Sequence, residues 1–137
     1  MIRRLAVVLL SGLLGACAES SRPLLRAPDP PPQVLTEECG GLRVQFTLVR
    51  KLRSTPAYEV SVTDLSGQPL AEDARVVLAF TSMGKDVSTT TVVVQPAGAG
   101  HYGSAGGFTL TSGPWRVEAI VRRVTEAEAV CVFDVNV

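Results

Sequence analysis

Hydrophobic and polar residues alternate with a period of two along most of the chain after residue 39. In residues 42–48, for example, Leu42, Val44 and Phe46 are separated by single polar or charged residues. Such alternation is typical of strands that bury one face. The runs expected to form strands are residues 42–48, 58–63, 76–80, 87–95, 108–111, 115–122 and 131–137.

Turn-forming residues separate these runs. The clusters are residues 64–69 (DLSGQP), 83–84 (MG), 96–98 (PAG) and 112–114 (SGP). Helix-like composition is confined to residues 124–129, which suffice for a single turn. About seven short strands without intervening helices predict an all-β protein, an antiparallel sandwich of two sheets.

The first sixteen residues have the anatomy of a secretory signal peptide. Arg3 and Arg4 form a basic start, residues 5–14 are apolar, and Gly15-Ala16 is a small-residue processing site. The apolar stretch is shorter than the roughly 20 residues of a membrane-spanning helix. We therefore expect residues 1–16 to be removed from the mature protein.

Cys17 follows directly, and Leu14-Gly15-Ala16-Cys17 resembles the lipobox of bacterial lipoproteins. The resemblance implies that the Cys17 thiol carries acyl chains, such as palmitate, which tether the mature chain to a membrane. An ordinary signal peptide with an incidental cysteine is the alternative. Ala18 rather than aspartate comes next, which by analogy with Gram-negative lipoproteins favours the periplasmic side of the outer membrane in such a host.

Residues 18–38 contain five prolines and show no apolar periodicity. Proline-rich chains favour an extended polyproline II conformation of about 3.1 Å per residue. We therefore expect residues 17–38 to be the lipidated cysteine and a disordered tether, and residues 39–137 to be the folded domain. A proline-rich recognition motif is the alternative for the same stretch.

The charge balance excludes one class of partner. The chain has 13 Lys and Arg against 13 Asp and Glu, a formal net charge of zero. Proteins that bind nucleic acids need a basic surface to collect phosphates. We expect no nucleic-acid partner.

Catalytic motifs are missing from the sequence. His101 is the only imidazole, and no G-x-S-x-G elbow is present. Ser104 lies near His101, in a small-residue run that lacks the phosphate-loop pattern. The adjacent carboxylates at 37–38 and 72–73 point to opposite sides of an extended chain, unlike the facing pair of a glycosidase. We expect no enzymatic activity.

Two cysteines remain after Cys17, and they lie at the two ends of the expected domain. Cys39 precedes the first run and Cys131 lies in the last. A secreted chain with two cysteines favours a disulfide, which would close a loop of about 90 residues and stabilise by roughly 4–5 kcal/mol. A redox pair, which more often has C-x-x-C spacing, and a Cu(I) thiolate site, which needs reducing conditions, are the alternatives.

One ordered set of turn and aromatic residues resembles a known family. The pattern is D-x-x-G-x-P, then M-G, then G-x-Y, then G-x-W-x-V, and it covers residues 42–123. It resembles the YtkA-like domain, a small secreted immunoglobulin-like β-sandwich that also occurs in bacterial copper-transport and copper-resistance membrane proteins. The motif residues are Asp64, Gly67, Pro69, Gly84, Gly100, Tyr102, Gly113 and Trp115. The glycines suit turns, and Tyr102 and Trp115 are large enough to anchor a core.

The resemblance implies extracytoplasmic copper handling beside a membrane copper transporter. Thioether sulfur suits Cu(I) and imidazole suits Cu(II), so Met83 and His101 are the candidate ligands. The leading hypothesis is different and needs no cofactor. It is a membrane-tethered, non-catalytic lipoprotein of the cell envelope that binds an envelope protein through a sheet edge or the loops at one end. Copper handling is the alternative.

Overall fold

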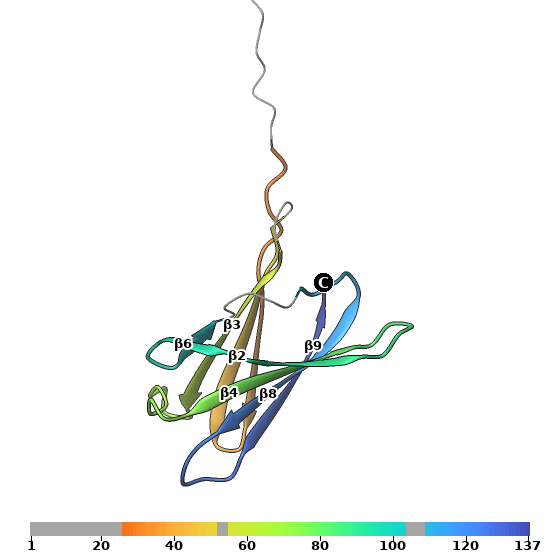
Figure 1. The fold of residues 1–137 in the computed structure, drawn as a ribbon. Helices are drawn as coiled ribbons and strands as arrows, with labels where there is room; N and C mark the ends of the chain where they lie inside the picture. Colours follow the sequence, from red (N-terminus) through yellow and green to blue (C-terminus); the bar gives the residue numbers. More distant parts are fainter. Residues whose placement is uncertain (1–25, 52–54, 104–108) are drawn as a thin grey trace, which may run out of the picture.

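Two antiparallel sheets packed face to face make up the folded part of the chain (Figure 1). The computed structural model describes residues 26–51, 55–103 and 109–137. The sheets have the strand orders β1-β2-β3-β7-β6 and β5-β4-β8-β9, so the expected all-β sandwich is confirmed. The strands are β1 (Gln33–Cys39), β2 (Leu42–Val49), β3 (Ala57–Asp64), β4 (Arg75–Ser82), β5 (Thr89–Val93), β6 (Gln95–Gly98), β7 (His101–Gly103), β8 (Pro114–Arg122) and β9 (Ala129–Asn136).

An aromatic cluster joins the inner faces of the two sheets. The Phe46 ring, from the five-stranded sheet, lies 6.4 Å from Phe80 and 5.8 Å from Phe133 of the other sheet, centroid to centroid. Tyr58 and Phe80 also meet across the interface, at 4.9 Å. Such pairs add about 0.5–1.5 kcal/mol each beyond their buried area. Because successive side chains of a strand point to opposite faces, these rings all point between the sheets, where they form the core.

The chain closes one side of the sandwich by crossing between the sheets. Val93 pairs with Val77 in the four-stranded sheet, and the Val94 amide donates to the Val76 carbonyl at 3.1 Å. The next residue, Gln95, pairs with Gly103 in the five-stranded sheet. We call residues 93–95 the strand switch. It joins the edge strands β5 and β6 covalently.

A disulfide closes the other side. Cys39 at the end of β1 is bonded to Cys131 of β9, with 5.5 Å between the Cα atoms and 92 positions between them in the sequence. The predicted disulfide is thus confirmed. At the opposite end of the same two strands, the Gln33 side-chain amide donates to the Asn136 carbonyl at 2.6 Å. Both long sides of the sandwich are therefore held.

The first strand begins earlier than the sequence predicts. A tether through residue 38 is expected, yet β1 starts at Gln33 and pairs with β2 over its whole length. The expectation fails because β1 is an edge strand with largely exposed side chains, so it needs no apolar alternation. Only residues 26–32 of the described tether lie outside helix and strand. Cys17 and residues 1–16 lie outside the described residues.

Three further local predictions change. The run 87–95 is split by the strand switch, and β7 was not expected as a strand. Thr109, Leu110 and Thr111 are not in a strand, although Leu110 is buried and the Thr111 carbonyl accepts a hydrogen bond from the Trp115 indole at 2.8 Å. Residues 124–128 form a loop without a helical turn, and Ala129 begins β9. In all three cases, tertiary packing overrides local pattern.

No helix within the described ranges has the length and hydropathy required to cross a bilayer.

Gly100 fixes how β7 approaches β3. Its φ is +71°, and a Cβ at this position would lie 2.7 Å from the Val62 carbonyl oxygen and 3.0 Å from the Pro69 Cβ. The Gly100 carbonyl in turn accepts the Val62 amide at 2.8 Å. Only glycine allows this close approach without shifting the backbone.

Gly100→Ala is predicted to destabilise the protein more than Gly41→Ala. Gly41 has a similar φ of +76° but open space around its Cβ position, so it costs only the backbone strain of about 1–2 kcal/mol. The steric overlap at Gly100 adds about 1–3 kcal/mol. Urea unfolding of both variants measures the difference, and equal losses would show that the approach to Val62 is not tight.

Candidate functional site

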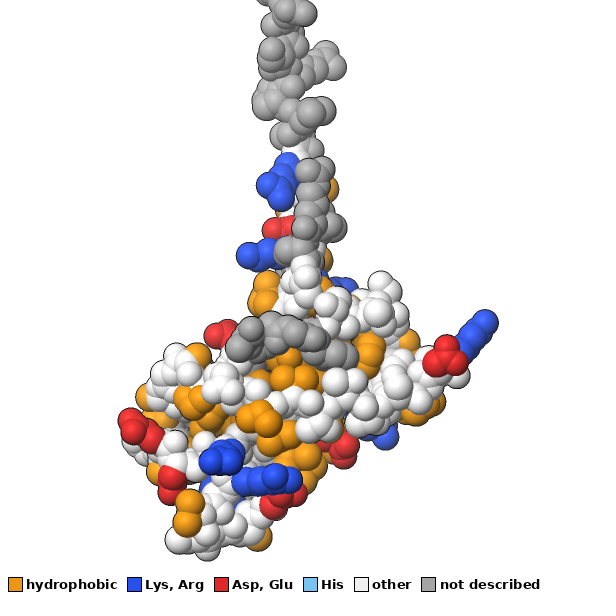
Figure 2. Space-filling view, in the orientation of Figure 1, with side chains coloured by type: hydrophobic (Ala, Val, Ile, Leu, Met, Phe, Trp, Pro, Cys, Tyr) orange, Lys and Arg blue, Asp and Glu red, His pale blue; other side chains and the backbone are white. Residues whose placement is uncertain are grey.

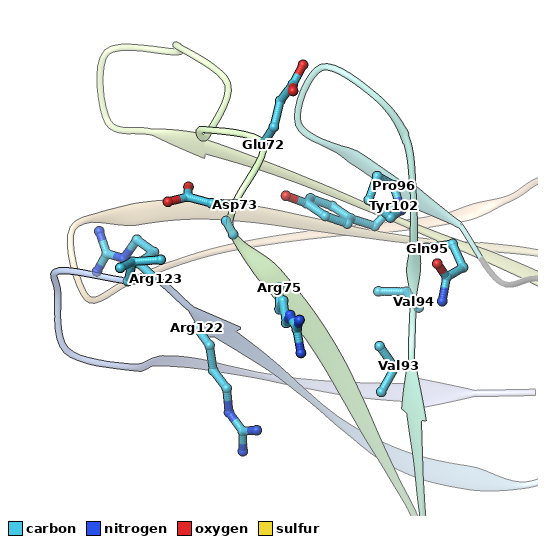
Figure 3. Close-up of a pocket in the computed structure, with 12 residues that line it drawn as sticks. Glu72, Asp73, Arg75, Val93, Val94, Gln95, Pro96, Tyr102, Arg122 and Arg123 are labelled. Carbon is cyan, nitrogen blue, oxygen red and sulfur yellow. The ribbon is translucent and has the colours of Figure 1, made fainter.

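A cleft of about 770 Å³ opens at one end of the sandwich, beside the strand switch (Figure 3). It opens where β5 leaves the four-stranded sheet at Val93, so Arg75, the first residue of β4, has no partner in β5. The lining residues come from the entry to β4, the strand switch, β7 and the exit from β8; they are Glu72, Asp73, Ala74, Arg75, Val93, Val94, Gln95, Pro96, Tyr102, Arg122, Arg123 and Val124. We call this space the end cleft.

Tyr102 and Asp73 lie together in the end cleft. The Tyr102 side chain is only 4% exposed, and in Figure 3 its hydroxyl points towards Asp73. Burial, and secondarily the negative charge of Asp73, raise the pKa of Tyr102 above its ordinary value of 10.0. The hydroxyl therefore stays protonated at neutral pH and can donate or accept a hydrogen bond.

Arginines line the opposite part of the end cleft. Arg75 and Arg122 face each other as a cross-strand pair of β4 and β8, and Figure 3 shows both side chains directed away from Asp73. Arg122 also donates to the Glu128 carboxylate at 2.8 Å. The cleft thus presents acidic groups near Tyr102, the guanidinium groups of Arg75 and Arg122 directed away from them, and an apolar side made by Val93, Val94 and Pro96.

Arg123 lines the end cleft and links two loops at this end of the sandwich. Its side chain is 16% exposed and forms an ion pair with Glu126. Its guanidinium also donates to the carbonyls of Gly40 and Ala127, each at 3.3 Å. The loop after β8 and the turn after β1 are joined in this way, which limits movement of the cleft wall.

A second hollow of about 580 Å³ continues from the end cleft. The two share Glu72, Pro96 and Tyr102, and the second extends to the turn at Gly98–Gly100. An extended polypeptide segment that crossed both hollows would contact Tyr102 at its middle.

Figure 2 shows charged side chains of both signs side by side towards the lower part of the molecule, with hydrophobic side chains between them.

Asp64 organises the neighbouring turn and does not reach the end cleft. Its carboxylate oxygen Oδ1 accepts the Ser66 hydroxyl at 2.6 Å and the amides of Ser66 and Gln68 at 2.9 Å each. These hydrogen bonds, led by that from the Ser66 side chain, lower the pKa of Asp64 below 3.8. Its role is to shape the turn that leads to Pro69 and β4.

The structure does not bring the two candidate copper ligands together. Met83 follows β4, and its amide donates to the Pro114 carbonyl at 3.0 Å. His101 opens β7 beside Gly100, which approaches Pro69 ahead of the start of β4. Met83 and His101 therefore lie towards opposite ends of β4. The chain does not supply them as one ligand pair.

The remaining motif residues lie in turns or in the core. Tyr102 and Trp115 are 4% and 6% exposed and belong to the core, while Gly67, Gly84 and Gly113 lie in turns or bends. Ser104 and Cys17 lie outside the described residues. Among the residues with described positions, no group of three or more His, Cys, Asp or Glu could hold a metal ion.

The sequence pattern alone does not identify several residues of the end cleft. Tyr102 was assigned to the core, and Asp73, Arg75 and Arg122 were assigned no site. Their positions in the sequence are far apart, and only the strand order places them together. The one local feature that could have indicated a site was the pair of adjacent acidic residues, Glu72 and Asp73, shortly before β4.

Comparison of the chain with protein-family models, with curated proteins and with solved structures finds no match.

Asp73→Asn is predicted to lower the pKa of Tyr102 while leaving it above 10, because burial is the larger cause. The raised pKa stabilises the fold below pH 10, and this contribution is lost as the pH rises through the titration of Tyr102. Near-ultraviolet titration of tyrosinate measures the shift, and Tyr102→Phe assigns the transition between the two tyrosines. Glu72→Gln is the control and should not change it. A pKa unchanged by Asp73→Asn would contradict the arrangement in Figure 3.

Proposed function

We propose that this protein is a membrane-tethered, non-catalytic lipoprotein of the cell envelope whose β-sandwich is a binding module. The membrane contact is the lipid on Cys17. In a Gram-negative host the domain lies on the periplasmic side of the outer membrane. The end cleft is the binding surface, and its partner is an envelope protein.

The position of the end cleft relative to the tether carries this proposal. The chain enters β1 at Gln33, whose side chain bonds to Asn136. Asn136 pairs with Pro114, at the end of β8 opposite Arg122. The tether and the end cleft therefore lie at opposite ends of the sandwich (Figure 1). A domain tethered in this way presents its cleft away from the membrane.

The lining of the end cleft supports binding rather than catalysis. The described residues that line it include no imidazole, thiol or serine hydroxyl, so they supply neither a Ser–His nor a Cys–His pair. They do supply apolar surface flanked by charges of both signs. This chemistry fits a polypeptide segment in which an apolar side chain is flanked by charged ones.

The disulfide supports the location. Structural disulfides form and persist in oxidising compartments such as the periplasm. Cys131 is 1% exposed and belongs to the core, as a structural bond requires.

Cys17→Ser is predicted to move the protein from the membrane fraction to the soluble periplasmic fraction, because a single residue carries the anchor. Metabolic labelling with an alkyne fatty acid, followed by fractionation, measures this in cells that express the full chain. Retention in the membrane fraction without label would contradict the lipid anchor.

Binding at the end cleft is tested separately with a photo-crosslinking residue in the full chain. Val124, 75% exposed at the cleft rim, is predicted to crosslink to an envelope protein, whereas Val34, 51% exposed in β1 near the tether, is not. Arg75→Glu should weaken this crosslink about tenfold, and Lys85→Glu at the far hairpin should not. Equal crosslinking from Val124 and Val34, or indifference to Arg75→Glu, would contradict the proposal.

A further inference from the structure

β5 differs from the other three edge strands of the sandwich, which are all protected against further pairing. The four edge strands are β1 and β6 of one sheet and β5 and β9 of the other. β1 and β9 lie against each other, held by the disulfide and by the hydrogen bond from Gln33 to Asn136. β6 has four residues, contains Pro96 and has a register shift beside it. Short length, proline and bulges all discourage a further strand.

The composition of β5 also leaves its edge open to pairing. The strand consists of threonine and valine alone (TTTVV), and both residue types favour strands. Every other strand of five or more residues carries at least one charged side chain. Charged side chains on an edge are a common means of preventing further pairing. β5 therefore keeps the full capacity to pair with another strand.

The pairing of β5 with β4 determines which backbone groups lie at this edge. The Val94 amide donates to the Val76 carbonyl at 3.1 Å. At the hairpin end, the Ser88 carbonyl accepts the Ser82 amide at 2.9 Å. Because the backbone groups of successive residues point to alternate sides of a strand, the even-numbered residues of this segment bond to β4. The amide and carbonyl groups of the odd-numbered residues then point away from the sheet. These residues are Thr89, Thr91 and Val93.

The inner side of β5 is incompletely covered. Thr90 lies opposite Phe80 of β4, and both partners of such a pair share one face of the sheet. Val92 lies opposite Leu78 in the same way. Phe80 and Leu78 are fully buried, whereas Thr90 is exposed and Val92 is only partly buried against the core. A strand added beside β5 would place alternate side chains next to these two, so apolar residues at those positions would extend the core.

We propose that β5 binds an extended segment of the envelope protein partner by strand addition, and that alternate residues of this segment are apolar. An open strand edge is recognised by another main chain through hydrogen bonds, and the alternate side chains supply the specificity. This inference rests on the proposed function. It adds the conformation and the residue pattern of the segment that the end cleft receives.

β5 leads directly into the end cleft. Val93 is the last residue of β5, and it lines the cleft together with Val94 and Pro96. A segment that pairs with β5 and continues past Val93 would therefore reach the apolar side of the cleft, and one polypeptide would occupy both. A second copy paired antiparallel through its own β5 would instead bring the β4–β5 hairpin, two strands wide, to this opening. The continuity thus favours a single extended segment of another protein.

Peptides of defined sequence test the edge. Short random peptides displayed on phage are selected on the oxidised full-length chain in non-ionic detergent, and those that bind are sequenced and synthesised. We expect apolar residues at alternate positions of these peptides. Amide hydrogen exchange measured by NMR should slow at least about tenfold at Thr89, Thr91 and Val93 when a peptide binds. It should change less at Thr90 and Val92, whose backbone groups already bond to β4.

Thr91→Pro tests the backbone contact, and Thr91→Val is its matched control. Proline at position 91 removes an amide that points away from β4, so the pairing with β4 is kept while the added strand loses a donor. We expect Thr91→Pro to weaken peptide binding at least about tenfold and Thr91→Val to leave it within about threefold. Circular dichroism and thermal unfolding verify that both variants fold.

Methylation of the peptide backbone makes the same test without changing this chain. Methylating the amides of one alternate set of peptide residues should abolish binding, and methylating the other set should leave it within about threefold. Equal effects of the two sets would overturn strand addition. So would a selection without binders, binders that leave the exchange of Thr89, Thr91 and Val93 unchanged, or equal affinity for Thr91→Pro and the unaltered chain.

Two further outcomes separate this inference from its alternatives. Protection of the same amides without peptide, rising with protein concentration together with a dimer in sedimentation, would assign the edge to a second copy and overturn the proposal. A crosslink from Val124 that Thr91→Pro leaves at full strength would overturn strand addition and keep the proposed function. Peptides that protect the edge of a chain whose Val124 crosslinks to no envelope protein would support strand addition and contradict the proposed role of the cleft.

Discussion

The bond between Cys39 and Cys131 is the constraint on which the rest of the arrangement depends. It ties the first strand of one sheet to the last strand of the other, across 92 positions of sequence. β1 contributes little to the core, since only Leu35 and Cys39 pack against it, and both are partly buried. The disulfide therefore holds an edge strand that hydrophobic burial alone holds weakly. The tether enters at the other end of the same strand, at Gln33, whose side-chain amide donates to the Asn136 carbonyl.

The strand switch is the counterpart of the disulfide on the opposite side, and it creates the end cleft. When the chain leaves the four-stranded sheet at Val93, it leaves Arg75, the first residue of β4, without a partner on that side. Arg75 and Asp73 then line an open space rather than a paired edge. One feature closes the sandwich and opens the candidate site.

Much of the fold could be predicted from the sequence, because the core residues lie at the hydrophobic positions of locally alternating runs. Phe46, Phe80 and Phe133 fall at inward positions of three runs that the pattern identifies. The two cysteines of the domain left a disulfide as the simplest pairing. The switch at Val94 could not be located in this way, since it lies inside the single run of residues 87–95. β1 was missed because its exposed glutamates, Glu37 and Glu38, resemble a linker.

The candidate site could not be predicted for a different reason. Its side chains come from separate segments, and the order of strands within the sheets decides which of them meet. The same order separates Met83 from His101, which local sequence cannot reveal. Asp64 was identified as part of a turn motif, and its hydrogen bonds to Ser66 and Gln68 give that motif a structural role.

Urea unfolding of the full-length chain, with the disulfide intact and after reduction, tests the central claim most directly. Because the bond closes a loop of 92 positions, the account predicts that reduction lowers the free energy of unfolding by about 4–5 kcal/mol. A loss of less than about 1 kcal/mol would show that packing alone holds the two edge strands together. The disulfide would then not be the constraint that holds β1 to β9.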